Sequence, residues 1–164
     1  MSVSADTLRT HLDYTAWASG ILVDAARTLT PEELNRDFGT ADKSVLGTLV
    51  HIFAGDRVWL RRIHGEPPTA FIEPEDHDFA RLQEAWPVVH RGWKEWAAGL
   101  TDSQATEDIA YRDMAGNAYQ QPAWQIVLHL VNHGTHHRGQ VSGFLRAMGY
   151  TPQALDLIAF YRQL

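Results

Sequence analysis

The chain has 164 residues, enough for one domain with a substantial hydrophobic core and too few for two. Hydrophobic residues make up 45% of it and charged residues 21%, as in ordinary soluble globular proteins. The net charge is −6, and the basic residues form no cluster beyond Arg61-Arg62, which argues against nucleic-acid binding. We therefore expect a single domain over residues 1–164 with no nucleic-acid partner.

The chain contains no cysteine, which excludes disulfides, zinc–thiolate sites and a cysteine nucleophile. Any thiol in its chemistry has to come from a small molecule. The segment Met1–Asp6 lacks the basic start and apolar run of a signal peptide. No stretch approaches the ~18 apolar residues that a membrane span needs. We expect a cytoplasmic protein with no membrane partner.

The first half of the chain predicts two long helices. The first begins at the capping segment Ser4–Asp6 and runs to about Thr28. The segment Thr30–Glu33 has a capping residue, a proline at the first helical position and two acids, and predicts only a short helical turn. Ser44 caps the second long helix, which runs to about Ile63.

The middle of the chain predicts a third helix and a small hairpin. The helix runs from about Phe79 to Leu100, and Pro87 inside it either kinks it or marks its true start. The hairpin consists of two short runs with aromatic residues, 109–114 and 118–120, on either side of a Gly-Asn turn.

A fourth long helix is predicted from Pro122 to about Met148, where Gly149 supplies a stop signal. Thr151-Pro152 opens a last short helix. Four long helices with short additions predict an all-α fold: a four-helix bundle with a small hairpin before the fourth long helix and a short C-terminal helix.

Four of the nine histidines lie on the predicted fourth helix, in or just before the run Asn132-His133-Gly134-Thr135-His136-His137-Arg138-Gly139-Gln140. At about 100° per residue, His133 and His137 fall in or beside the apolar stripe of this helix, where Leu or Ile is usual. His129 and His136 fall on the edge of the stripe, where we expect packing, hydrogen bonds to a neighbouring ring or rim contacts. The stripe consists of Ile126, Leu130, Val141, Phe144 and Met148.

Because His133 and His137 are four residues apart, their rings stack on one face of the helix. Burying two imidazoles there costs roughly a few kcal/mol unless each finds a partner. A metal ion between them satisfies both rings, and so does a hydrogen-bonded pair of core histidines. The spacing leaves both interpretations open.

A third ligand would have to come from another core helix, because bundles build metal sites from facing helices. His51, within Leu49-Val50-His51-Ile52-Phe53, has the most apolar neighbours of the remaining five histidines, and Gly55 one turn later leaves space beside its ring. The other four lie beside the proline-rich loop, where we expect them solvated, or on helices among polar neighbours. They are His64 and His77, then His11 and His90.

These residues resemble the DinB/YfiT-like family of metalloenzymes, and the likeness covers nearly the whole chain. His51 and the run 132–140 carry its specific part; weaker similarity lies in 14–18, 124–129 and 156–161. The resemblance implies an up-down-down-up four-helix bundle that binds a divalent metal through His51, His133 and His137, often with water completing the shell. It also implies a homodimer. It transfers no single reaction, since relatives include thiol-dependent transferases and isomerases.

The sequence thus favours an enzyme that uses a divalent metal ion such as zinc, nickel or iron to activate water or a low-molecular-weight thiol, as a transferase or hydrolase acting on a small molecule. Arg138 either anchors an anionic substrate group or forms a surface salt bridge. Gln140 and Thr135 are candidates for hydrogen bonding near the site. The alternative function is a non-catalytic, stress-related bundle that binds metal or a partner.

The sequence names no general base. Asp13 and Asp56 lie on core helices, but nothing in the pattern separates them from the acids that keep helix faces soluble. No Ser-His-Asp order or pair of carboxylates offers a competing mechanism.

Overall fold

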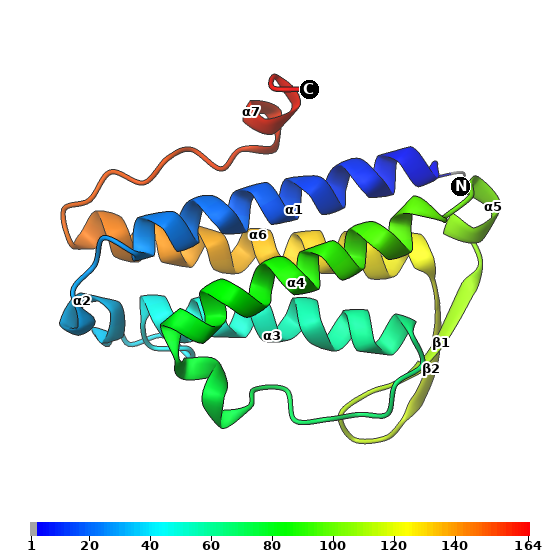
Figure 1. Cartoon of the computed structure of the whole chain (residues 1–164), viewed down its shortest axis with the longest axis horizontal. Coiled ribbons are helices and arrows are strands. Elements are labelled where there is room, and N and C mark those ends of the chain that lie inside the picture. Colours follow the sequence, from blue (N-terminus) through cyan, green and yellow to red (C-terminus); the bar gives the residue numbers. More distant parts are fainter. Residues whose placement is uncertain (1–2) are drawn as a thin grey trace.

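The computed structural model describes residues 3–164, and four long helices dominate it. They are α1 (Ala5–Ala26), α3 (Val45–Ile63), α4 (Phe79–Ala98) and α6 (Ala123–Ala147). In Figure 1, α3 and α4 run in one direction, and α1 and α6 run in the opposite one. The predicted all-α bundle with up-down-down-up topology is therefore confirmed.

Side-chain caps fix where the helices begin. Ser4 accepts a hydrogen bond from the Thr7 amide at the start of α1, and Ser44 accepts one from the Gly47 amide at the start of α3. The predicted short turn is the five-residue helix α2 (Pro31–Asn35), closed by a capping box. Helix α4 begins at Phe79, so Pro87 lies inside the helix and does not mark its start.

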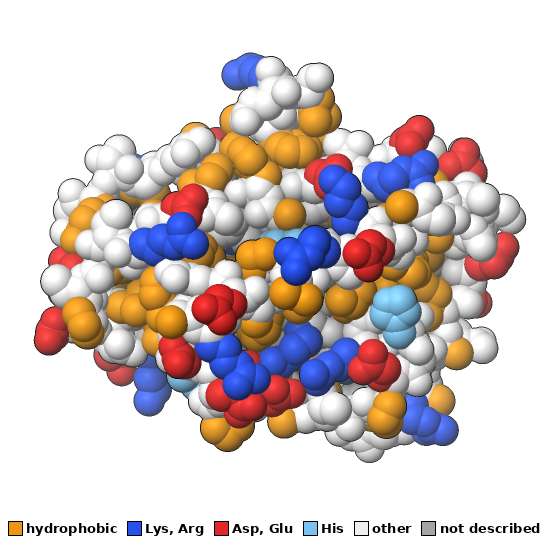
Figure 2. All heavy atoms as spheres, in the orientation of Figure 1, with side chains coloured by type: hydrophobic (Ala, Val, Ile, Leu, Met, Phe, Trp, Pro, Cys, Tyr) orange, Lys and Arg blue, Asp and Glu red, His pale blue; other side chains and the backbone are white. Residues whose placement is uncertain are grey.

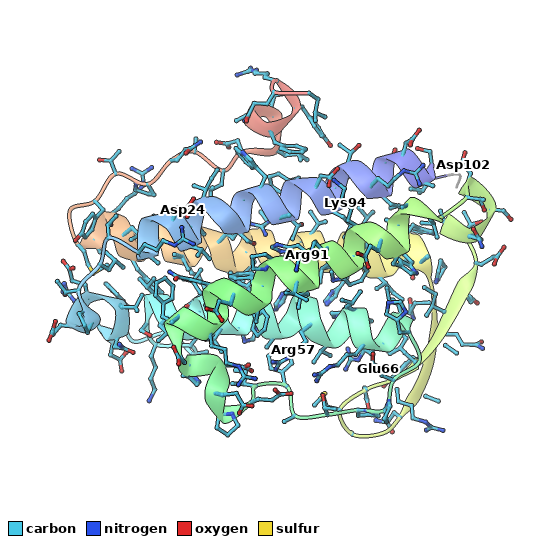
Figure 3. All side chains as sticks on the ribbon, viewed as in Figure 1. Asp24, Arg57, Glu66, Arg91, Lys94 and Asp102 are labelled. Carbon is cyan, nitrogen blue, oxygen red and sulfur yellow. The ribbon has the colours of Figure 1, made fainter. Side chains whose placement is uncertain are left out.

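A long connection carries the chain back along the bundle so that α3 and α4 run parallel (Figure 1). It contains a 3₁₀ helix, η1 (Pro74–His77), that the sequence analysis did not predict. Arg57 of α3 projects toward this connection (Figure 3) and forms a two-pronged ion pair with the buried Asp76, both N–O distances being 2.7 Å. This ion pair fastens the connection to α3.

The predicted hairpin is present as strands β1 (Asp108–Arg112) and β2 (Ala118–Pro122), antiparallel, with Tyr111 opposite Tyr119. Gly116 makes the turn with a φ of +88°, a conformation that glycine adopts without strain. A four-residue helix before β1, α5 (Asp102–Ala105), was not predicted. The hairpin closes the end of the bundle where α6 begins (Figure 1).

The C-terminal segment differs from the prediction. The last helix, α7 (Leu157–Tyr161), begins five residues after Pro152, and residues 151–156 are not helical. The Tyr14 hydroxyl on α1 donates a hydrogen bond to the Leu155 carbonyl, at 2.8 Å. This tertiary contact holds the segment extended along the bundle, where the proline signal alone suggests a helix.

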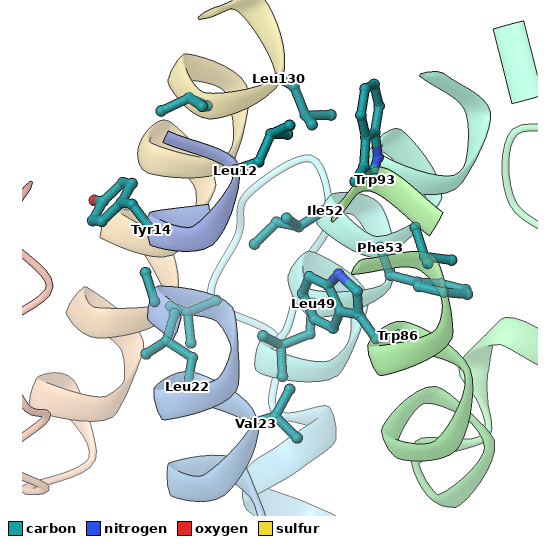
Figure 4. Close-up of a cluster of buried hydrophobic side chains, with 14 of the residues drawn as sticks. Leu12, Tyr14, Leu22, Val23, Leu49, Ile52, Phe53, Trp86, Trp93 and Leu130 are labelled. Atoms are coloured by element: carbon teal, nitrogen blue, oxygen red, sulfur yellow. The ribbon is translucent and has the colours of Figure 1, made fainter. Parts of the chain in front are cut away.

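Side chains from all four long helices form the core (Figure 4). Trp86 and Trp93 of α4 are its largest fully buried apolar side chains. Basic and acidic side chains are interspersed over the face shown in Figure 2, with no area of one sign. None of the helices within residues 3–164 is both long and apolar enough to cross a membrane.

Candidate metal centre

Three histidines meet between α3 and α6. His51 comes from α3, and His133 and His137 come from successive turns of α6; all three side chains are partly buried. One ring nitrogen from each lies within 4.8 Å of the other two, and the Nε2 atoms of His51 and His133 are 3.0 Å apart. The structure therefore brings together the three side chains that the sequence analysis selected.

Gly55 makes room for one of these rings. A Cβ atom at Gly55 would lie 2.9 Å from Cε1 of His133 and 3.2 Å from its Nδ1. This space was expected beside His51 on the same helix, and the side chain that lies nearest to it is that of His133. The ring that occupies it crosses from α6, so the glycine lets the two helices bring their histidines together.

Polar groups hold the outer edges of two rings. Nδ1 of His51 lies 3.2 Å from one oxygen of Asp42, and Nδ1 of His137 lies 3.8 Å from the other. Nδ1 of His137 is also 2.8 Å from Oε1 of Gln140, so Gln140 lies at the site as predicted. Acceptors at Nδ1 favour the tautomer with the proton there and leave the Nε2 lone pairs free to bind a metal ion.

Sequence reasoning missed Asp42. It lies in the loop before α3, where Lys43 has a φ of +62° and the Phe38 amide donates to the Lys43 carbonyl at 2.8 Å. A Cβ atom on Gly47 would overlap the Asp42 carbonyl oxygen, so the glycine lets the loop lie against the helix. The available signal was an acid two residues before the Ser44 cap, but the sequence does not show where the loop turns.

Burial keeps the ring nitrogens available for a metal ion. Desolvation, reinforced by the neighbouring His137 and His51, lowers the pKa of His133 to about 4 from its ordinary 6.5. Desolvation also lowers the pKa of His51, although Asp42 opposes the shift. Both effects favour neutral rings near pH 7, the form that binds metal ions.

An aromatic ring lies against the cluster. Phe71, in the connection between α3 and α4, contacts His51 edge-on with ring centres 5.2 Å apart. Arg57 donates a hydrogen bond to the Phe71 carbonyl at 3.1 Å, and the same guanidinium holds Asp76. The anchored connection thus places an apolar ring beside His51.

The remaining histidines lie outside this cluster. His129 and His136 are exposed, and His129 packs between Trp59 and His133 with ring centres 5.2 and 6.0 Å away. His64 and His77 are exposed, as expected for solvated side chains.

His90 differs from the expectation of a polar setting. It packs on Trp86, and its Nε2 lies 3.4 Å from a carboxylate oxygen of Asp56. Asp56 itself is 0% exposed and accepts a hydrogen bond from Trp86 Nε1 at 2.8 Å, so it is no solubilising surface acid. Asp13 is exposed.

Arg138 and Thr135 lie on another side of α6. Arg138 is 1% exposed, so the predicted surface salt bridge is wrong. Its guanidinium contacts Thr135, Ser19 and the ring of Tyr14, on the side of α6 that faces α1. Thr135 also bonds the Val131 carbonyl, so neither residue reaches the histidines.

The donor set fits a divalent metal ion. Three neutral imidazoles from two helices are typical ligands of zinc, nickel or iron. The cluster could hold such an ion, and three protein ligands would leave at least one coordination position for water or substrate.

Known proteins resemble the chain over most of its length. Protein DinB of Bacillus subtilis (strain 168) is 21% identical over 159 residues, which cover 88% of this chain and 87% of that protein. The crystal structure of a DinB-like protein from Bacillus cereus ATCC 10987 matches with a TM-score of 0.63 and 21% identity, over 88% of this chain and 94% of that one. The DinB family model matches residues 1–163. The chain belongs to the DinB family.

Proposed function

We propose that this protein is a divalent-metal-dependent enzyme whose ligands are His51, His133 and His137. The observation that carries the proposal is the convergence of three ring nitrogens from two helices within 4.8 Å, with a carboxylate behind two of the rings. A hydrogen bond between the Nε2 atoms of His51 and His133 satisfies only those two of the partly buried rings, whereas a metal ion satisfies all three.

The reaction class that fits is a transfer or hydrolysis in which water or a low-molecular-weight thiol is the nucleophile. A bound divalent ion supplies Lewis acidity, which lowers the pKa of a coordinated water or thiol and polarises an electrophile. Three neutral ligands preserve the full charge of the ion, which favours this role. The absence of cysteine requires that any thiol be a co-substrate.

The chain's own residues contribute orientation and a partly desolvated setting. Asp42 and Gln140 hold the Nδ1 edges of His51 and His137, so the ring planes are fixed before a metal ion binds. Phe71 lies on the His51 side and places an apolar ring against that edge of the cluster. Gly55 allows His133 to approach α3. Each residue acts through position.

The second candidate function is a non-catalytic metal-binding bundle, in which the ion fixes the register of α3 against α6. The tight packing of His133 over Gly55 favours this alternative, because the same contact that shapes the site also locks the two helices. A structural zinc site is usually closed by four protein ligands, whereas this cluster contains three.

One experiment separates the two functions. The metal-stripped protein is reloaded with zinc, nickel or iron and assayed with a panel of low-molecular-weight thiols and an electrophilic substrate, and separately for hydrolysis. Turnover that requires the metal and disappears in His137→Ala, while circular dichroism shows the bundle intact, supports the enzyme. Loss of helical structure on metal removal, without turnover in any arm, supports the structural role and contradicts the enzyme.

A further inference from the structure

Arg138 carries a buried charge that the metal centre does not use. Its side chain is 1% exposed and faces α1, whereas the adjacent His137 faces α3. Across residues 3–164, no carboxylate oxygen lies within 4 Å of its guanidinium. Buried arginines are normally paired with an anion, so this unpaired one calls for a function.

The hydrogen bonds that the guanidinium makes are long, and all go to neutral groups. Nη1 lies 3.4 Å from Oγ of Ser19, Nη2 lies 3.2 Å from Oγ1 of Thr135, and Nε has no partner. The local sequence nevertheless makes space for it, because a Cβ atom on Gly134 would lie 2.5 Å from Nη1. The fold therefore accommodates a guanidinium and leaves it without a strong acceptor.

A cavity of about 370 Å³, open to solvent, lies between α1, α6 and the segment that leads into α7, and Arg138 is among the residues that line it. We call it the Arg138 cavity. Its volume lies in the range of small-molecule sites. The hydrogen bond from the Tyr14 hydroxyl to the Leu155 carbonyl holds its outer wall in place. The lining contains both hydroxyl and apolar groups. The hydroxyls are chiefly those of Thr135 and Ser142, and the apolar groups are chiefly those of Tyr14, Val131, Leu155 and Leu157.

The charges around the cavity narrow the kind of anion that fits. Asp156 lies at its edge and is exposed, so it disfavours a strongly charged ligand such as a phosphate dianion. Burial lowers the pKa of Arg138, while Tyr14 and the buried Asp56 of α3 raise it, and an arginine stays protonated throughout. A monoanion with an apolar body matches one fixed positive charge beside an apolar wall.

We propose that the Arg138 cavity binds a small organic carboxylate, separately from the three histidines. The carboxylate accepts hydrogen bonds from the Arg138 guanidinium, and its hydrocarbon body packs against Tyr14 and Leu155. A guanidinium and a carboxylate form two parallel charge-assisted hydrogen bonds, which gives the buried arginine its missing partner. This binding site does not depend on the reaction proposed for the metal centre.

Isothermal titration calorimetry of the full chain with benzoate and hexanoate tests the proposal. Benzyl alcohol is the uncharged control and inorganic phosphate is the polar anion. We expect saturable 1:1 binding of the carboxylates, weaker binding of phosphate and none of benzyl alcohol. Because a carboxylate can also bind a metal ion, the titration is run on metal-loaded and metal-stripped protein and on His137→Ala, and the affinity should agree in all three.

Two variants locate the ligand. Arg138→Gln removes the charge and should weaken carboxylate binding by about 10- to 100-fold, the usual effect of losing a charged hydrogen bond. Gly139→Leu places a side chain in the cavity, where a Cβ atom meets nothing within 4 Å, and should weaken binding by at least about tenfold. Gly143→Leu is the matched control, since Gly143 has the same open space on the same helix outside the cavity.

Several results would overturn the proposal. One is the absence of saturable carboxylate binding, and another is phosphate binding more tightly than either carboxylate. A third is carboxylate binding that His137→Ala abolishes and that Gly139→Leu and Arg138→Gln leave intact. The anion would then be a ligand of the metal ion. If Arg138→Gln fails to fold, the comparison of Gly139→Leu with Gly143→Leu decides the outcome.

Discussion

On the side of α6 that packs against α3, His133 and His137 meet His51, and polar groups hold the outer edges of two of the rings. On the side that packs against α1, Arg138 is more deeply buried, yet only hydroxyls and a ring contact it. On the α3 side, hydrogen-bond acceptors thus lie beside neutral imidazole rings. On the α1 side, a cationic guanidinium has no anion beside it. The two proposals follow this difference: a metal cation bound by the ring nitrogens on one side, and an anion paired with the arginine on the other.

The largest expected effect is the loss of metal affinity when one histidine ring is removed from the α3 side. His137→Ala should weaken metal binding by about 100- to 1000-fold, because each ligand supplies a large share of the binding free energy. Metal titration by calorimetry measures it. His136→Ala is the matched control, since His136 is exposed and adjacent in the chain. Equal loss in both variants would mean that the metal ion does not bind at the cluster.

Asp42 tests whether the groups behind the rings matter. Asp42→Asn should weaken metal binding by about 10- to 100-fold. The reason is that the variant lacks the carboxylate that orients His51 and raises the basicity of its ring. Asp37→Asn in the same loop is the control, since Asp37 is exposed and its Oδ1 accepts from the Gly39 amide. If the metal affinity of Asp42→Asn is unchanged, the Asp42 carboxylate does not contribute to metal binding.

The histidine side should also make the metal-free protein sensitive to acid. His133 stays neutral in the folded state down to about pH 4, whereas the unfolded chain takes up its proton near pH 6.5. The unfolded state binds more protons in this window, so stability falls as the pH drops. We expect a loss of about 1 kcal/mol between pH 7 and pH 5, after allowance for partial exposure.

Urea unfolding at the two pH values measures this loss. His133→Leu should reduce it, although the pKa of His51 is lowered in the same direction and retains part of the effect. A stability of the wild-type protein that does not change across the window would show that the rings are less desolvated than the structure indicates.

The smallest effect on stability is expected on the α1 side. Arg138→Met keeps the shape of the side chain and removes a buried charge without a close counterion, so the free energy of unfolding should stay within about 1 kcal/mol of wild type. Urea unfolding without added carboxylate measures it. A loss of roughly 3 kcal/mol or more would mean that Arg138 is already paired within the fold, and the contrast between the two sides would fail.

Much of the fold follows from local signals in the sequence. Caps at Ser4 and Ser44, the break after Ile63 and the glycine after α6 place the long helices close to their observed ends. The short elements follow less well, because tertiary contacts decide them. Residues 151–156 lack helix although a proline follows a threonine there, since this segment is bonded to Tyr14.

The histidine cluster was predictable because two of its members repeat at helical spacing on an apolar stripe. Apart from Gln140, the residues that surround the cluster were not predictable. Asp42 reaches the site through a loop whose turn depends on the left-handed Lys43 and the close approach allowed by Gly47. Gly55 serves the facing helix, and Arg138 points away from the histidine that precedes it. Contacts between different helices leave no periodic pattern in the sequence, so the sequence does not predict them.

X-ray absorption spectroscopy of the zinc-loaded protein tests the central claim most directly, because it counts the ligands of the bound ion. The account predicts three imidazole nitrogens at about 2.0–2.1 Å and at least one further light-atom ligand from solvent. His137→Ala should lose one imidazole from that shell. A wild-type shell with fewer than three imidazoles, or with four, would contradict an open site made by His51, His133 and His137.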